Sequence, residues 1–133
     1  MSKKQIKKKV GKKKIRRSVI SGIVSIKATF NNTIITIADE NGEVISWCSA
    51  GAAGFKGARK STPYAAQVSA EKAAENAKIS CGLEKVRVYV KGGGPGREQS
   101  IRGLHAAGLD LTAIIDRTPH PFGGCRRKKP RKT

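Results

Sequence analysis

The cationic residues of this chain are concentrated at its two ends, and this limits which part of the chain can fold. Residues 1–17 contain ten lysines and arginines and no acid, and residues 126–133 contain six more and no acid. The chain has 28 Lys+Arg and 9 Asp+Glu in total, so residues 18–125 carry a net charge of only +3. Runs of like charge repel themselves and bury no apolar surface, so both ends are predicted to be disordered when free.

A formal net charge of +19 on 133 residues predicts a polyanionic partner. Nucleic acid fits best, because the tails would order on it with release of counterions. Solvated tails and an anionic membrane are the alternatives, but no amphipathic helix with a bulky apolar face accompanies either tail. No apolar run approaches ~20 residues and no apolar stretch follows the basic start, so neither a membrane-spanning helix nor a secretory signal is expected.

Three cysteines, Cys48, Cys81 and Cys125, form an odd and widely spaced set. This spacing predicts neither a disulfide framework nor a four-ligand zinc site, and it favours a reducing compartment.

Alternating apolar residues predict a three-stranded antiparallel meander. Within 19–30, Val24, Ile26, Ala28 and Phe30 alternate with polar residues. Asn31-Asn32 is a turn signal, 33–38 is a second strand, Asn41-Gly42 is a second turn, and 44–49 is a third strand containing Trp47.

The second half of the chain alternates helices with strands. Ser61 or Thr62 is predicted to cap a helix that has Pro63 at its first position and ends at Gly82, with a buried face of small residues: Ala66, Ala70, Ala73, Ala77 and Cys81. A strand over 85–91, a short helix from about 98 to 107 and a strand over 109–116 follow, and residues 50–60 are expected to be a flexible loop. The order β-β-β-α-β-α-β predicts an α/β layered domain with a mixed sheet. We expect this domain at 18–118, between basic tails at 1–17 and 119–133.

Two glycine-containing loops are candidate phosphate sites. Residues 92–97 (Gly-Gly-Gly-Pro-Gly-Arg) open directly into a helix, where backbone N–H groups attract anions and Arg97 can add a bidentate contact. Residues 54–60 place Lys56, Arg59 and Lys60 among glycines before a helix. A tight turn and a surface loop, respectively, are the alternatives on spacing alone. Loops that follow strands of an α/β sheet tend to share one edge, so the two loops are predicted to lie together.

The sequence does not favour an enzyme, a cofactor or a metal. A two-metal nuclease needs carboxylates that converge on strands. The first strand has none, and Asp110 and Asp116 are predicted to lie on the same side of the last strand but at opposite ends. His105 and His120 have no evident nucleophile or metal set beside them. The six aromatic residues are expected to be mostly core, with Phe55 and Phe122 the most exposed, which argues against a base-stacking platform.

Several of these segments resemble the bacterial-type small-subunit ribosomal protein eleven family. The resemblance covers about residues 17–126. Four blocks carry it: residues 27–37 (Lys-Ala-Thr-Phe-Asn-Asn-Thr-Ile-Ile-Thr-Ile), 46–51 (Ser-Trp-Cys-Ser-Ala-Gly), 54–67, which contain Gly-Phe-Lys-Gly-Ala-Arg-Lys, and 94–98 (Gly-Pro-Gly-Arg-Glu). Residues 108–119 and Gly124-Cys125-Arg126 also fit the family. The C-terminal tail departs from the family pattern, since Phe122-Gly123-Gly124 replaces His-Asn-Gly and the later double proline is absent. The divergent ends indicate an unusual bacterium or a plastid-encoded copy.

The resemblance implies a ribonuclease-H-like strand order and a non-catalytic structural protein of the small ribosomal subunit. It implies binding to small-subunit rRNA on the platform, beside other platform proteins and near messenger RNA where the Shine–Dalgarno helix forms. No membrane, small-molecule substrate or cofactor is expected. The predicted RNA-binding residues are the cations of both tails, two turn asparagines, the loop cations and one helix arginine: Lys3, Lys4, Lys7, Lys8, Lys9, Lys12, Lys13, Lys14, Arg16, Arg17, Asn31, Asn32, Lys56, Arg59, Lys60, Arg97, Arg102, Arg126, Arg127, Lys128, Lys129, Arg131 and Lys132.

Overall fold

Five strands pair into one mixed sheet in the computed structural model, which describes residues 18–132. The strands are β1 (Ser21–Ala28), β2 (Thr33–Asp39), β3 (Val44–Ser49), β4 (Lys85–Lys91) and β5 (Asp110–Asp116). Their order across the sheet is β3-β2-β1-β4-β5. β2 is antiparallel to both of its neighbours, whereas β1, β4 and β5 pair in parallel. The predicted α/β class, mixed sheet and strand order are confirmed.

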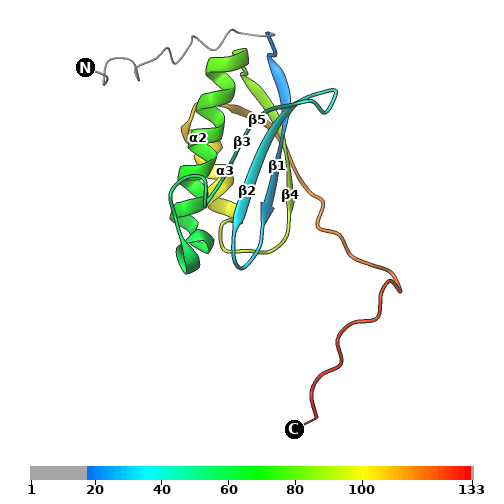
Figure 1. Ribbon diagram of the computed structural model, residues 1–133. Coiled ribbons are helices and arrows are strands. Elements are labelled where there is room, and N and C mark those ends of the chain that lie inside the picture. The colour runs from blue at the N-terminus through cyan, green and yellow to red at the C-terminus, as the bar shows by residue number, and fades with distance from the viewer. Residues whose placement is uncertain (1–17, 133) are drawn as a thin grey trace, which may run out of the picture.

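Two α helices, α2 (Pro63–Cys81) and α3 (Arg97–Ala106), cover one face of this sheet (Figure 1). Thr62 caps α2, since its hydroxyl accepts a hydrogen bond from the Ala65 N–H at 3.3 Å. Gly82 ends the helix in the left-handed conformation, with φ of 68°. The predicted face of small residues, from Ala66 to Cys81, is buried, so α2 lies close to the sheet. None of the helices in the described part of the chain is long and apolar enough to span a membrane.

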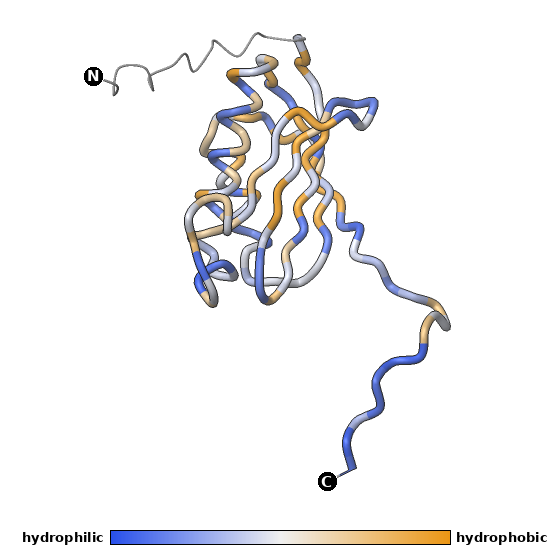
Figure 2. Tube along the Cα trace, viewed as in Figure 1, coloured by the Kyte–Doolittle hydropathy of each residue, from blue (hydrophilic) through white to orange (hydrophobic). Residues whose placement is uncertain are grey.

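The core fills the layer between the sheet and the helices. β-branched side chains supply the sheet half of it, and α3 and the segments that precede β4 and β5 supply leucines. Figure 2 shows this apolar band running along the strands. The largest buried apolar side chains are Val24, Ile26, Ile35, Ile37, Leu83, Val86, Val88, Val90, Leu104 and Leu109. The opposite face of the sheet, here called the open face, carries no helix from residues 18–132 (Figure 1).

The expectation that residues 50–60 form a flexible loop is wrong in part. A short 3-10 helix, η1 (Gly57–Ser61), occupies the end of this segment. The backbone N–H of Arg59 donates to the Lys56 carbonyl at 3.2 Å, and the hydroxyl of Ser61 donates to the Ala58 carbonyl at 3.1 Å. These local bonds fix the backbone that carries the loop cations. The composition of the segment, rich in glycine and alanine, does not reveal them.

The expectation that most aromatic residues are core is also wrong. None of the six is buried, and Phe30, Trp47, Tyr64 and Phe122 are 60–99% exposed. The core is built from alanine, valine, isoleucine and leucine instead. Phe30 follows the alternation of β1 but lies outside the strand, because the chain turns after Ala28.

The two aspartates of β5 lie on opposite faces of the sheet, contrary to the sequence prediction. The register between β4 and β5 shifts by one residue, since Val86 faces Leu111 while Arg87 faces Ala113. The extra residue, Thr112, is a β-bulge, and an inserted residue reverses which face the later side chains point to. Asp116 is therefore aligned with buried Val90 and points toward the helix layer.

Candidate nucleic-acid interface

Four strand ends meet at one edge of the sheet. β2 is antiparallel to β1 and β3, and β4 and β5 are parallel to β1, so all strands except β2 end at the same side. This edge, here called the cationic edge, consists of the turn 29–32, residues 54–61, the glycine loop 92–97 and the start of the C-terminal tail at 117–118 (Figure 1). The prediction that the two loops share an edge is confirmed.

The turn between β1 and β2 is fixed by its own side chains. The Thr29 hydroxyl accepts from the N–H of Asn32 at 3.0 Å, and the side-chain oxygen of Asn32 accepts from the N–H of Thr33 at 2.9 Å. Asn32 is half-buried and acts within the turn, whereas Asn31 and Phe30 are exposed. Of the two predicted asparagines, Asn31 is thus the better placed to touch a ligand.

The glycine loop packs directly on this turn. The Gly94 N–H donates to the Ala28 carbonyl at 3.0 Å. A Cβ atom on Gly92 would collide with the Ala28 carbonyl oxygen, and one on Gly94 would collide with the Thr29 carbonyl oxygen. These two glycines therefore allow a close approach of two backbone segments, which accounts for them without any bound phosphate.

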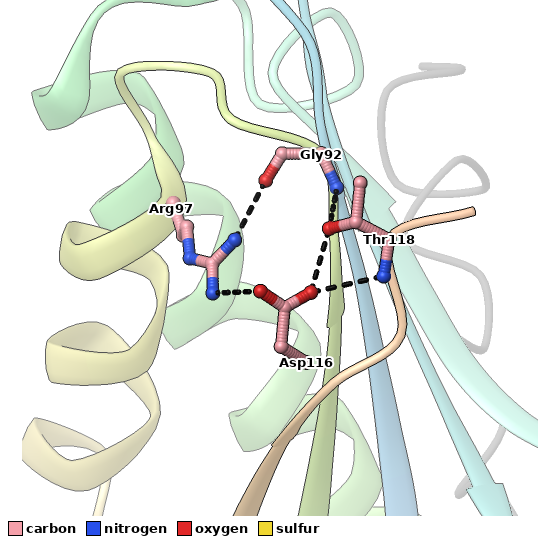
Figure 3. Close-up of polar contacts among 4 residues, drawn as sticks. All are labelled: Gly92, Arg97, Asp116 and Thr118. Carbon is pink, nitrogen blue, oxygen red and sulfur yellow. Dashed lines mark hydrogen bonds and ion pairs between the residues drawn. The ribbon is translucent and has the colours of Figure 1, made fainter. Parts of the chain in front are cut away.

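Arg97 is held by the protein itself, as Figure 3 shows. Its Nη1 donates to the Gly92 carbonyl at 3.0 Å, and its Nη2 pairs with Asp116 Oδ2 at 2.8 Å. The other carboxylate oxygen of Asp116 accepts from the hydroxyl and N–H of Thr118 at 2.6 and 2.9 Å. We call these four residues the Arg97 clamp. The bonds from Thr118 and then Arg97 hold the pKa of the Asp116 carboxyl well below its usual range, so the carboxylate stays charged near neutral pH.

The Arg97 clamp joins the glycine loop to the start of the tail. The Gly92 N–H donates to the Thr118 hydroxyl at 3.1 Å, which closes the ring of contacts in Figure 3. Sequence reasoning assigned Arg97 to a phosphate and missed Asp116 and Thr118 as its partners. Strand parity placed Asp116 on the same face of the sheet as Asp110, at the opposite end of the strand, and only the bulge at Thr112 turns Asp116 toward Arg97.

Residues 54–61 present three cations on a fixed backbone. Lys56 and Arg59 are exposed, Lys60 is half-buried, and no ion pair within residues 18–132 holds any of the three. Gly54, Phe55, Lys56 and Arg59 line a hollow. Phe55 is fixed there by an edge-to-face contact with Tyr64, with ring centroids 5.8 Å apart and planes at 81°. A rigid backbone and unpaired cations can hold phosphates at a fixed spacing.

A second hollow lies at the start of α3, lined by Pro63, Gly93, Gly94, Pro95, Arg97, Glu98 and Gln99. No side chain among the residues that the structure describes caps α3 at Gly96, which leaves N–H groups of the first turn open to an anion. Glu98 lies in that first turn, and its carboxylate competes with a phosphate for the same groups. Residues 54–61 therefore fit phosphate better than the α3 terminus does.

The remaining predicted residues lie away from this edge or outside the described part. Arg102 is exposed on α3. The C-terminal cations, Arg126, Arg127, Lys128, Lys129, Arg131 and Lys132, are exposed on a segment without helix or strand that runs away from the sheet (Figures 1 and 2). The N-terminal cations from Lys3 to Arg17 lie outside the described residues. Lys27 and Lys91, which border the edge in register, were not predicted.

Side chains suited to metal binding do not gather in residues 18–132. No set of three or more His, Cys, Asp or Glu side chains there can hold a metal ion. Burial raises the pKa of the Cys48 thiol, which disfavours a thiolate nucleophile at that position. The chemistry that this arrangement supports is the binding of anions by positive charge.

Comparison with known families agrees with the geometry. The family model described as ribosomal protein S11 matches residues 22–132, which is nearly all of the part that the structure describes. The match includes the sheet, both helices, all four segments of the cationic edge and most of the C-terminal tail.

Proposed function

Since the chain belongs to the ribosomal protein S11 family of small-subunit, rRNA-binding proteins, we propose that its cationic edge and tails bind small-subunit rRNA on the platform. The observation that carries this proposal is the convergence of the turn 29–32, residues 54–61 and the start of the tail on one side of a rigid sheet. The folded loops fix the position and orientation of the protein on the RNA, and the cations of the tails contact phosphates along the RNA backbone.

In this proposal the three parts of the chain have separate roles. Residues 18–118 form the scaffold, while residues 1–17 and 119–133 are RNA-binding tails. Lys56, Arg59 and Lys60 contact phosphates, because they are cationic, rigidly placed and unpaired within the described chain. Arg97 positions the glycine loop and the tail.

The protein thereby supports assembly of the platform and the region where messenger RNA pairs with rRNA. Its neighbours are other platform ribosomal proteins, and its role is structural, not enzymatic. It resides on ribosomes of the cytoplasm, or of the plastid stroma if the copy is plastid-encoded.

Sedimentation of a lysate through a high-salt sucrose gradient tests this function. The chain is expected to remain stoichiometric with the small subunit. Release into the free or nucleoid fraction would instead indicate non-specific binding by charge. A competition at matched salt between a folded rRNA domain and duplex DNA separates the two readings further, since only a specific rRNA protein prefers the folded RNA.

A further inference from the structure

The open face of the sheet displays aromatic residues in a single row. Trp47 of β3 is paired in register with Thr36, which is aligned with Ser25, then Tyr89, then Ile115 of β5. Trp47 is 60% exposed, and Tyr89 is half-buried. The row thus has an aromatic ring on each side of two small hydroxyl side chains. Three strand spacings, ~14 Å, separate the two aromatic positions.

A guanidinium extends the aromatic surface at Tyr89. The Cζ atom of Arg117 lies 4.2 Å from the centroid of the Tyr89 ring. Arg117 is exposed, and its backbone is fixed by a 2.8 Å hydrogen bond from its N–H to the Val90 carbonyl. A guanidinium held over a ring leaves its outer side open to another planar group, such as a nucleobase.

Positive charge dominates the strand residues of this face. Lys27, Lys85, Arg87 and Lys91 point to it, and the one opposing acid among these strand side chains is Asp110, aligned with Lys85. Such a surface fits a polyanion and disfavours a basic or purely apolar partner. Lys27 and Lys91 are aligned with each other and lead directly into the turn 29–32 and the glycine loop. The open face is therefore continuous with the cationic edge.

We propose that the open face binds a single-stranded segment of RNA. Bases stack on Trp47 and on the Tyr89–Arg117 pair, while Lys27 and Lys91 contact the phosphates. A duplex does not fit this arrangement, because its bases are already stacked and its grooves offer no face to an aromatic ring. The proposal rests on RNA binding by this chain but assigns a second surface, distinct from Lys56, Arg59 and Lys60.

Trp47 is the only tryptophan of the chain, so its fluorescence reports directly on this surface. The experiment titrates an unstructured 12-nucleotide single-stranded RNA into the full chain. Saturable quenching is expected, with weaker quenching by a duplex of the same length. Polyglutamate is the acidic-protein probe. Equal quenching by polyglutamate would overturn the proposal, because charge alone would then explain binding.

Variants then separate stacking from charge, with affinity measured by anisotropy of labelled RNA. Trp47→Ala and Tyr89→Ala are each expected to weaken binding of the single strand roughly 5- to 150-fold, the effect of losing one stacked base. Trp47→Phe should retain most of the affinity. Ile34→Ala is the matched control, because Ile34 is on the same face, 38% exposed and not aromatic. Unchanged affinity in both Trp47→Ala and Tyr89→Ala would overturn the proposal.

Binding to a folded rRNA domain distinguishes failure of the open-face proposal from failure of the proposed function. The Lys56→Ala, Arg59→Ala, Lys60→Ala triple variant should lose affinity for the folded domain while still quenching with the single strand. If the triple variant binds the folded domain normally, the cationic edge is wrong and the open face stands. The folding of every open-face variant is checked by circular dichroism, and none of these variants removes a core side chain.

Discussion

The salt dependence of RNA binding should distinguish cations that contact phosphate from a cation that positions the interface. The first change is the triple replacement of Lys56, Arg59 and Lys60 by alanine, and the second is Arg97→Ala. The first three cations have no ion-pair partner in the described chain, whereas the Arg97 guanidinium already pairs with a carboxylate at 2.8 Å. A cation that is already paired with a carboxylate displaces few counterions from RNA. The triple variant should therefore change the salt dependence of binding, whereas Arg97→Ala should not.

The expected size follows from counterion release. Each lost phosphate contact reduces the slope of log K against log salt by about 0.7–0.9. The triple variant should therefore reduce the slope by about 2–3, and at 0.1 M salt it should weaken binding about 100- to 500-fold. If the intact chain neutralises about eight phosphates, its slope is roughly −6 to −7. Arg97→Ala should leave the slope nearly unchanged and weaken binding by the same factor at every salt concentration.

The assay is filter binding of the full chain to a folded rRNA domain at four or more salt concentrations. Thermal unfolding of each variant confirms that the fold is intact. If Arg97→Ala reduces the slope by about 0.7–0.9, the effect of one lost phosphate contact, then Arg97 contacts phosphate in the complex. The assignment of a positioning role to the Arg97 clamp would then be refuted.

Three further outcomes are expected from single features of the fold. Thr33→Val should raise the melting temperature by about 3–8 °C, because the buried Thr33 hydroxyl lacks a hydrogen-bond partner within residues 18–132 and such a group costs about 1–2 kcal/mol. The control Thr36→Val, on the open face, should change the melting temperature little, and equal shifts in the two variants would contradict this account. Gly103→Ala should destabilise the protein in urea unfolding, since the new Cβ would lie 2.7 Å from the Gln67 carbonyl oxygen. The cost of overpacking, about 1–3 kcal/mol, exceeds the gain of about 1 kcal/mol in helix propensity. A rise in stability would show that α3 shifts freely. Exposed Cys125 should be alkylated by iodoacetamide well before Cys48, because burial raises the pKa of the Cys48 thiol. Peptide mass spectrometry measures the order of alkylation, and the reverse order would show that β3 opens readily.

Most of the fold could be predicted from local sequence patterns. The strand over 85–91 and the strand over 44–49 match the observed bounds, and Thr62, Pro63 and Gly82 bound α2 as expected. These elements carry their own signals, namely period-two alternation and capping residues. The shared edge of the loops also followed, since it depends only on strand direction.

Features that depend on contacts between distant segments could not be predicted. The bulge at Thr112 reverses the face of Asp116, and no local pattern announces a bulge. The partner of Arg97 therefore stayed hidden. The aromatic residues were expected to be mostly core, but the small residues of α2 and the β-branched side chains of the sheet fill the core without them.

The order of the strands has a consequence for synthesis of the chain. β1 is synthesised early, but β4, which pairs with the edge of β1 opposite β2, is synthesised late. Ser21 of β1 is aligned with Lys85 of β4, which is 64 residues further along the chain. A nascent chain that ends at Cys81 has the β1–β2–β3 meander and α2, while one edge of β1 lacks its partner and the α3 leucine is not yet made. An unpaired strand edge beside exposed valine and isoleucine side chains is prone to aggregate. The last third of the chain thus completes the central strand, and truncation before residue 91 is expected to yield an insoluble product.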